Sequence, residues 1–303
     1  SSRQGGALWA SPPNSNLVMA IDPIVIEHCR FIENAARDGG GAISSGRSLK
    51  LTDCNFTGNA TTSISGTAAG GAIGLYASSS TPCSAMIEGC NFTENYASMG
   101  GAIHTQPGNV GGNISIINST FIGNAARDRA GAINIHQIFN TIMLNSIIAG
   151  NRANNNGGFI AAGPTQISSC TIAGNASFST GPSSMITYPD AKIRNCIFVD
   201  YGPRVGTASG DIKYNNVRGG LPLEGNIDLD SRFVKPGYWA NPNNPNIILE
   251  PNDLNAVWVN GDYHLRNDSP CIDAGDPNYV SGTAETDLDG NPRVVDVVDM
   301  GAY

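Results

Sequence analysis

The sequence predicts an all-β protein, a right-handed parallel β-helix (solenoid) with an irregular C-terminal cap. Two recurring motifs lead to this prediction. The first, Cys-x-Phe-x-x-Asn, stands at residues 90–95 and recurs, with Ser for Cys or Ile for Phe, starting at residues 29, 54, 119, 146 and 170. The second, Gly-Gly-Ala-Ile, stands at residues 100–103 and recurs in variants after the other copies. A repeat of this length is the signature of a solenoid.

The third observation is the alternation inside each repeat. Apolar side chains precede the Cys or Ser by three and five residues, as Leu49 and Leu51 precede Cys54. A period of two predicts a short strand with one buried face. Two further short alternations follow, so we expect three strands per turn, no helix, and equivalent residues stacked about 4.8 Å apart.

One column of each repeat holds an asparagine. We expect side-chain amides in this column to donate to one neighbour and accept from the other, and these residues to take the left-handed backbone of a sharp corner. The predicted ladder consists of Asn34, Asn59, Asn95, Asn124, Asn151 and Asn175. The Gly pair is expected at the opposite corner, where a Cβ would clash.

The chain is expected to form one structural domain in two parts. Residues 1–200 hold the β-helix repeats, and residues 201–303 hold degenerate rungs and a C-terminal capping segment. Residues 235–253 are rich in Pro and Asn and are predicted to be irregular, with Tyr238 and Trp239 folded back on the stack. Residues 293–298, Arg-Val-Val-Asp-Val-Val, read as a strand.

The two motifs resemble the repeats of the chlamydial polymorphic outer membrane proteins and, more broadly, right-handed parallel β-helix proteins of bacterial surfaces. Residues 262–265, 269–276, 287–293 and 299–303 resemble the closing segment of secreted β-helix proteins of planctomycetes and related bacteria. The resemblance implies the fold and an extracellular or cell-surface location. It implies no single activity, because this architecture hosts adhesins, structural proteins and polysaccharide enzymes alike.

Composition excludes several classes of partner. Only 14% of residues are charged and the net charge is −8, so no basic stripe is available for nucleic acid. The sequence contains no run of about 18 apolar residues, so it predicts no membrane span.

The five cysteines of the repeats are expected to be buried as small hydrophobes. Whether a disulfide joins Cys83 and Cys271 is left open.

The positions predicted to point outward after each Ala-Ile pair carry no Asp, Glu, Lys or Arg. A lyase or hydrolase needs a base or paired carboxylates, so we expect no enzyme. These positions are Ser44, Gly74, His104, Asn134, Ala161, Thr187, Gly46, Tyr76, Gln106, His136, Gly163 and Pro189. Tyr76, His104, Gln106, Asn134 and His136 form a candidate site for a metal or a sugar; the alternative is a solvated polar face.

The pattern Asp287-x-Asp289-Gly290 is similar to the start of a calcium-binding loop. Asp273 and Asp276 are further candidate ligands. A structural calcium ion is therefore the one cofactor considered. The alternative is an Asp-Gly turn with no cofactor.

The leading hypothesis for function is a non-enzymatic extracellular structural or adhesive protein. Its first rung, which begins near residue 5, would leave strand edges open, and open edges pair with further strands. We therefore expect copies of the chain to assemble head to tail into a surface filament, unless an upstream part of a longer chain covers that end. The second hypothesis is a secreted β-helix that binds or cleaves a cell-surface polysaccharide.

Overall fold

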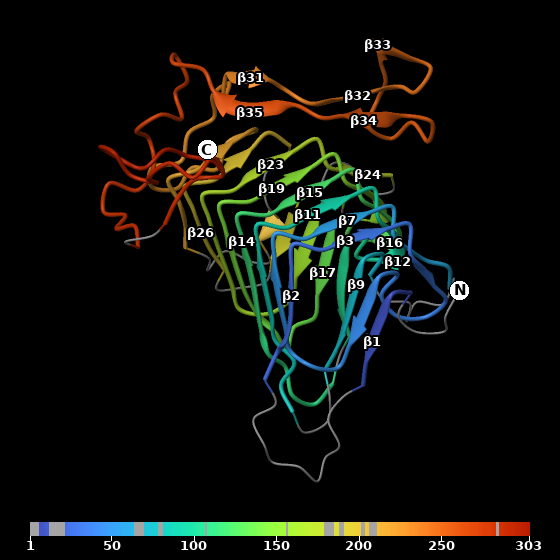
Figure 1. Cartoon of the computed structure of the whole chain (residues 1–303). Coiled ribbons are helices and arrows are strands. Elements are labelled where there is room, and N and C mark those ends of the chain that lie inside the picture. The colour runs from blue at the N-terminus through green and yellow to red at the C-terminus, as the bar shows by residue number, and fades with distance from the viewer. Residues whose placement is uncertain are drawn as a thin grey trace.

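The chain winds into a parallel β-helix, which confirms the predicted fold class (Figure 1). The computed structural model describes residues 6–11, 22–63, 70–77, 81–106, 108–155, 157–178, 185–187, 191–200, 204–205, 211–282 and 285–303. Within these ranges, no helix is long and apolar enough to cross a membrane.

Four parallel sheets run along the axis. Sheet 1 contains β1 (Leu8–Ala10), β5 (Ile43–Ser45), β9 (Ile73–Tyr76), β13 (Ile103–Gln106), β17 (Ile133–Ile135), β21 (Phe159–Ala161), β25 (Met185–Thr187) and β28 (Arg204–Val205). Sheet 2 contains β2 (Ile24–Glu27), β6 (Leu49–Thr52), β10 (Ala85–Glu88), β14 (Asn113–Ile117), β18 (Asn140–Leu144), β22 (Thr165–Ser168), β26 (Lys192–Arg194) and β29 (Asp211–Lys213).

Sheet 3 contains β3 (Arg30–Ile32), β7 (Asn55–Thr57), β11 (Asn91–Thr93), β15 (Thr120–Ile122), β19 (Ile147–Ala149), β23 (Thr171–Ala173), β27 (Ile197–Phe198) and β30 (Asn216–Val217). Sheet 4 contains β4 (Ala35–Ala36), β8 (Ala60–Thr61), β12 (Tyr96–Met99), β16 (Ala125–Arg129), β20 (Arg152–Asn155) and β24 (Ala176–Ser177). The sequence predicted three strands per turn, so sheet 4 is a correction. Its strands are short and mostly begin with alanine, which gives no clear alternation.

The core is a set of stacked side-chain columns. Phe31, Phe56, Phe92 and Phe121 stack face to face with ring centroids 4.6–4.8 Å apart. Phe56, Phe92 and Phe121 are fully buried, as are the isoleucines that lead the strands of sheet 1. The spacing equals the distance between rungs, so equivalent residues pack on one another as the repeat predicts.

The cysteine column is buried from Cys54 onward, but its members do more than fill space. The backbone N–H of Cys54 donates to the Cys90 Sγ, that of Cys90 donates to the Ser119 Oγ, and that of Ser119 donates to the Ser146 Oγ. Cys and Ser can therefore replace each other in this column, because the side chain of either residue can accept a hydrogen bond from the backbone N–H at the corner. Cys83 and Cys271 are buried free thiols, so no bridge joins them.

The column of corner asparagines is continuous. Each Nδ2 group donates to the Oδ1 atom of the asparagine in the next rung at 2.8–3.0 Å, and each backbone N–H donates to the same oxygen. The expected left-handed backbone lies one residue earlier, which is a correction. Glu33, Gly58, Glu94, Gly123, Gly150 and Gly174 have φ between 53° and 65°. The turn at this preceding residue directs the asparagine amide into the corner, along the axis.

The Gly pair forms the corner between sheets 4 and 1, whereas the asparagine column lies between sheets 3 and 4. The two corners therefore flank the short sheet 4 and are not opposite each other, which is a correction. A Cβ on Gly41, Gly71 or Gly101 would lie 2.0–2.1 Å from a carbonyl oxygen of the next rung. Such contacts with backbone cannot relax, so glycine is required at these positions.

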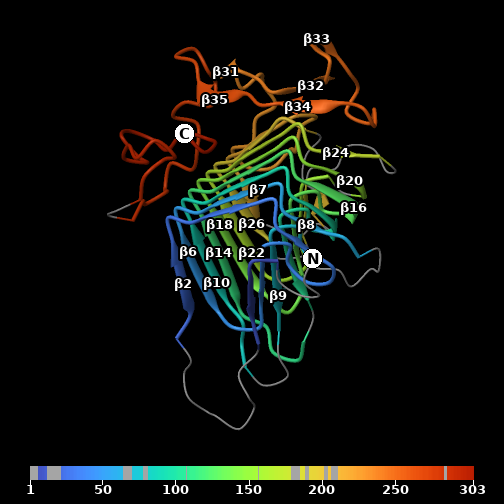
Figure 2. The same ribbon diagram turned by 45° about the vertical axis from the view of Figure 1, so that its right-hand side comes forward.

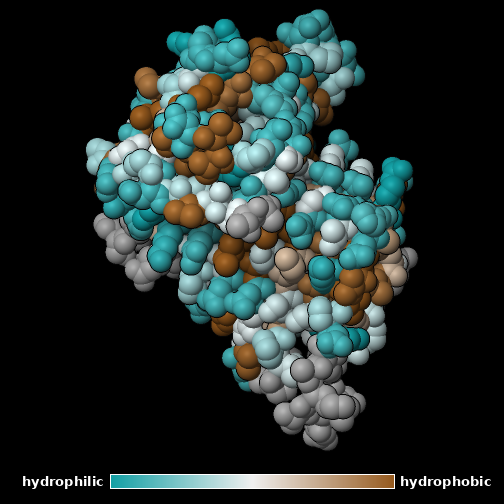
Figure 3. Space-filling model, turned by 60° about the vertical axis from the view of Figure 1, so that its left-hand side comes forward, coloured by the Kyte–Doolittle hydropathy of each residue, from teal (hydrophilic) through white to brown (hydrophobic). Residues whose placement is uncertain are grey.

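The C-terminal segment lies along the side of the β-helix, over the outer face of sheet 3 in its late rungs (Figures 1 and 2). In the late rungs this outer face carries several apolar residues, Ile147, Ala149, Ala173 and Ile197. The apolar ones are buried under the cap residues Phe233, Tyr263, Cys271, Met300 and Ala302. On the face seen in Figure 3, the hydrophobic residues that stay exposed are scattered among hydrophilic ones.

Two predictions for this segment were wrong. Residues 235–253 are largely ordered in strands, because β32 (Tyr238–Asn241) pairs with both β33 (Asn244–Ile248) and β34 (Val257–Val259). Residues 293–298 form no strand; instead the buried Arg293 donates to the carbonyl oxygens of Asp299 and Gly301. The remaining pair, β31 (Phe233–Lys235) and β35 (Asp262–Leu265), is antiparallel.

The two ends of the β-helix differ. Beyond β30 the chain turns back on the last rung: the Val217 N–H donates to the Ile227 carbonyl, and Leu221 packs against the core. At the other end, β1, β2, β3 and β4 each pair with one strand only among the described residues.

Candidate functional site

The residues predicted to form a site on sheet 1 lie in two neighbouring pairs. Gln106 pairs in register with Tyr76, and His104 pairs with Asn134. His136 follows β17, and its backbone N–H donates to the Thr105 Oγ1 at 2.8 Å. The structure thus brings the five candidates onto adjacent rungs of one sheet. Their role as ligand-binding residues stays a prediction.

His104 is buried rather than exposed, since only 6% of its surface is accessible. The pKa of His104 is lowered to about 4, chiefly by burial and in smaller part by the nearby His136 and Arg129, while a backbone hydrogen bond with Asn134 opposes this shift. The imidazole is therefore neutral at pH 7. The Nδ1 atoms of His104 and His136 are buried and have no hydrogen-bond partner within the described part of the chain.

One part of the predicted outward column was wrong. Ile133 pairs with Phe159 and Asn134 with Ile160, so Ala161 points inward beside Ile135. The Gly157-Gly158-Phe159-Ile160 copy is offset by one residue from the other Gly-Gly-Ala-Ile copies. Pro189 lies outside the described residues. Ser44, Gly74, His104, Asn134 and Ile160 share the corrected column, and none of them is acidic.

The aspartates considered as calcium ligands have other partners. Asp287 Oδ1 accepts the backbone N–H groups of Asp289 and Asn291 at 2.9 Å, which is the geometry of an Asp-Gly turn. Asp276 forms an ion pair with Arg194, and Asp273 accepts the backbone N–H of Val297. In the part of the chain that the structure describes, no group of three or more His, Cys, Asp or Glu side chains is placed to hold a metal ion.

Sequence reasoning missed a cluster centred on His264. Its Nδ1 atom contacts Asp262 Oδ1, its Nε2 atom lies 2.7 Å from Asp289 Oδ2, and its ring stacks on Tyr303 at 3.9 Å. Burial lowers the pKa of His264, but hydrogen bonds to the two carboxylates outweigh this effect and raise it overall. The cluster joins β35 to residues near the C-terminus, so it holds the cap together electrostatically.

The asparagine ladder ends in a carboxylate, which the sequence analysis also missed. Asp200 lies 25 residues after Asn175, which is one repeat. Its oxygens accept the backbone N–H groups of Gly174 and Asn175 and the Asn175 side-chain amide. Burial raises the pKa of Asp200 to about 6, although these hydrogen bonds act to lower it. The one-repeat spacing was the available signal.

Asp200 also lines a groove of about 340 Å³, together with Arg218 and Glu250. Two carboxyl groups in one groove could suggest a hydrolase. However, both Asp200 oxygens are occupied by N–H donors of the ladder. The carboxylate is therefore explained as the acceptor that closes the column.

The fold defines the chain as a parallel β-helix protein with a laterally packed cap. Comparison with protein-family models, with characterised proteins and with solved structures gives no match in any of the three.

Proposed function

We propose that the protein is an extracellular structural or adhesive β-helix that associates end to end through its first rung. The observation that carries the proposal is the state of that rung. Its four strands each lack a second neighbouring strand among the described residues, so within that part of the chain no strand pairs with their outer edges. Such edges pair readily with another chain.

The side chains of the first rung fit a contact surface. Leu8, Ile24, Ile26 and Phe31 point into the core but are only partly buried, whereas their equivalents in later rungs are fully buried. The Phe31 ring has a stacking partner, Phe56, on one side only among the described residues. A second molecule could continue both the sheets and the ring stack, which would remove this apolar surface from water.

The opposite end is partly covered by residues 218–229. A head-to-tail contact would have to use the strand edges that this segment leaves open, and it would give a filament because it does not close. The resemblance of the repeats to bacterial surface proteins supports a surface location. The absence of acidic residues from the corrected outward column supports a structural rather than a catalytic role.

The test is a charge placed at the end of the stack. Replacing Ile26 by Lys puts an ammonium group at the proposed contact, where its partial exposure lets the long side chain reach water. The control is Val280→Lys, at a site that is 87% exposed on the cap. Sedimentation velocity over a range of concentrations should show assemblies for the wild type and Val280→Lys, but monomers for Ile26→Lys. Equal behaviour of all three would refute the proposal.

A further inference from the structure

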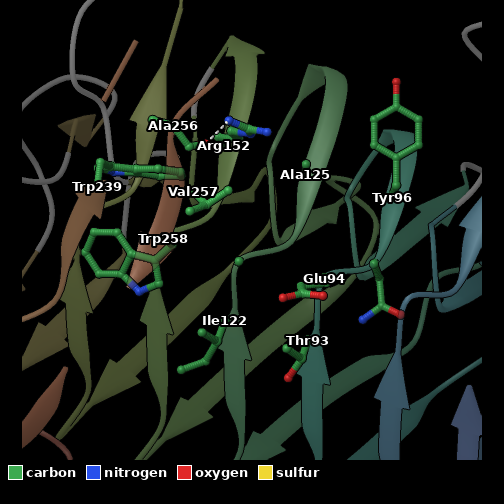
Figure 4. Close-up of a pocket in the computed structure, with 13 residues that line it drawn as sticks. Thr93, Glu94, Tyr96, Ile122, Ala125, Arg152, Trp239, Ala256, Val257 and Trp258 are labelled. Atoms are coloured by element: carbon green, nitrogen blue, oxygen red, sulfur yellow. Dashed lines mark hydrogen bonds between the residues drawn. The ribbon is translucent and has the colours of Figure 1, made fainter. Parts of the chain in front are cut away.

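A notch on the outside of the β-helix lies at the junction of sheets 3 and 4 (Figure 4). Its floor is the rung of Gly123 and Ala125, where the side chains are absent or small. One wall is formed by Glu94 and Tyr96 from the preceding rung. The other is formed by Arg152 from the following rung, with Val257 and Trp258 from the cap. The groove has a volume of about 330 Å³.

The register of the strands sets the width of the notch. Tyr96 pairs with Ala125, and Ala125 pairs with Arg152, so the two large side chains are two rungs apart. Two rung spacings amount to about 9.6 Å. The small Ala125 side chain lies between Tyr96 and Arg152, which leaves the floor of the notch open.

The walls have opposite charges, and neither charge is in an ion pair among the described residues. Arg152 is half-buried: its Nη1 donates to the Ala256 carbonyl at 2.8 Å, and its guanidinium lies 5.7 Å from the Trp239 ring centre. A guanidinium has five N–H donors, so most of them remain available. The Glu94 side chain leans over the floor, since its Cγ lies 3.7 Å from where a Gly123 Cβ would be.

Glu94 is also held in an unfavourable backbone conformation. Its φ is 56°, in a column where four of six rungs have glycine. A side chain in this region costs about 1–2 kcal/mol relative to glycine, a cost that Glu33 shares at the same corner two rungs earlier.

Tyr96 supplies an exposed aromatic ring, since 45% of its surface is accessible. On the opposite side, the Trp258 ring covers Gly150 and Gly174, where an added Cβ would lie about 2 Å from the indole. Val257 is exposed and adds apolar surface to that wall.

We propose that this notch binds a neutral pyranose unit of a polysaccharide. The apolar face of a pyranose can pack on the Tyr96 ring, while its hydroxyl groups accept from Arg152 and donate to Glu94. A polyanion is disfavoured by Glu94 and by the net charge of −8. An extended peptide is disfavoured because β12, β16 and β20 are hydrogen-bonded on both sides and leave no edge to extend. The site does not depend on end-to-end association.

The chain offers well-matched variants. Ala125→Tyr fills the floor with a side chain that the neighbouring rung already accommodates at position 96. Glu94→Gly removes the carboxylate and leaves the residue found at this corner in most rungs. Glu33→Gly makes the same change at the same corner, two rungs away and outside the notch.

Binding can be measured by isothermal titration calorimetry with cellohexaose, xylohexaose and mannohexaose, and with hexagalacturonate as the acidic oligomer. We expect at least one neutral oligomer to bind the wild type and Glu33→Gly equally. Glu94→Gly and Ala125→Tyr should bind it at least about tenfold more weakly, with unchanged circular dichroism. The proposal fails if no neutral oligomer binds, if Ala125→Tyr binds as the wild type does, or if hexagalacturonate binds most tightly.

Discussion

Replacing Asn124 by Ala tests the role of the asparagine ladder, because this residue lies in its middle. Asn124 Oδ1 accepts the backbone N–H and the side-chain amide of Asn95, and its Nδ2 donates to Asn151 Oδ1 and to the Phe92 carbonyl. The substitution would leave the Asn95 backbone N–H and the Phe92 carbonyl buried without these partners. Each group that loses its partner costs about 1–3 kcal/mol, so we expect a total loss of about 2–6 kcal/mol.

The control for this experiment is Asn91→Ala. Asn91 lies one repeat before Asn124, and its amide also donates to an asparagine in the neighbouring rung, but the hydrogen bond is exposed. A surface change of this kind costs about 0.5 kcal/mol or less. Urea unfolding followed by circular dichroism compares the two variants at equal m-value. If Asn124→Ala loses no more stability than Asn91→Ala, the buried ladder does not stabilise the fold as we describe.

Three further predictions concern the core, the cap and pH. Phe92→Ala removes a fully buried ring from between two stacked neighbours and should cost about 3–5 kcal/mol by urea unfolding; normal stability would mean that the strand faces are inverted. Gly150→Ala should expose the cap to limited proteolysis because a Cβ would strike Trp258, whereas Gly58→Ala, at an equally left-handed φ, should not; equal cleavage would contradict the cap contact. His264 has a raised pKa in the folded state, so its stabilisation is full at pH below the unfolded value of about 6.5 and is lost as pH rises through the folded value. The melting temperature of His264→Gln should therefore fall furthest below that of the wild type at acidic pH. A difference in melting temperature that grows as the pH rises would contradict this prediction.

The repeat columns could be predicted from the sequence because each position makes its contacts with its own equivalent. Phe31, Phe56, Phe92 and Phe121 are about one rung apart in space, so a period in the sequence translates directly into stacking. The same reasoning would have found Asp200, which stands one repeat after Asn175. It misplaced Ala161 because one copy of the glycine motif is offset by a residue.

The position of the cap could not be predicted in this way. The sequence shows where outward positions become apolar, as at Ile147 and Ala149, but not which later segment covers them. Contacts such as Trp258 on Gly150 join residues more than a hundred positions apart, and the period of the repeat does not predict them. The notch has the same origin, because the sequence supplies Tyr96 and Arg152 in register while the cap supplies the rest of the wall.

Electron microscopy of the purified native protein tests the central proposal most directly. If the open first rung is an association surface, the images should show linear particles in which the β-helix axes of successive copies are aligned. Single, unassociated particles at every concentration would contradict end-to-end association through the first rung.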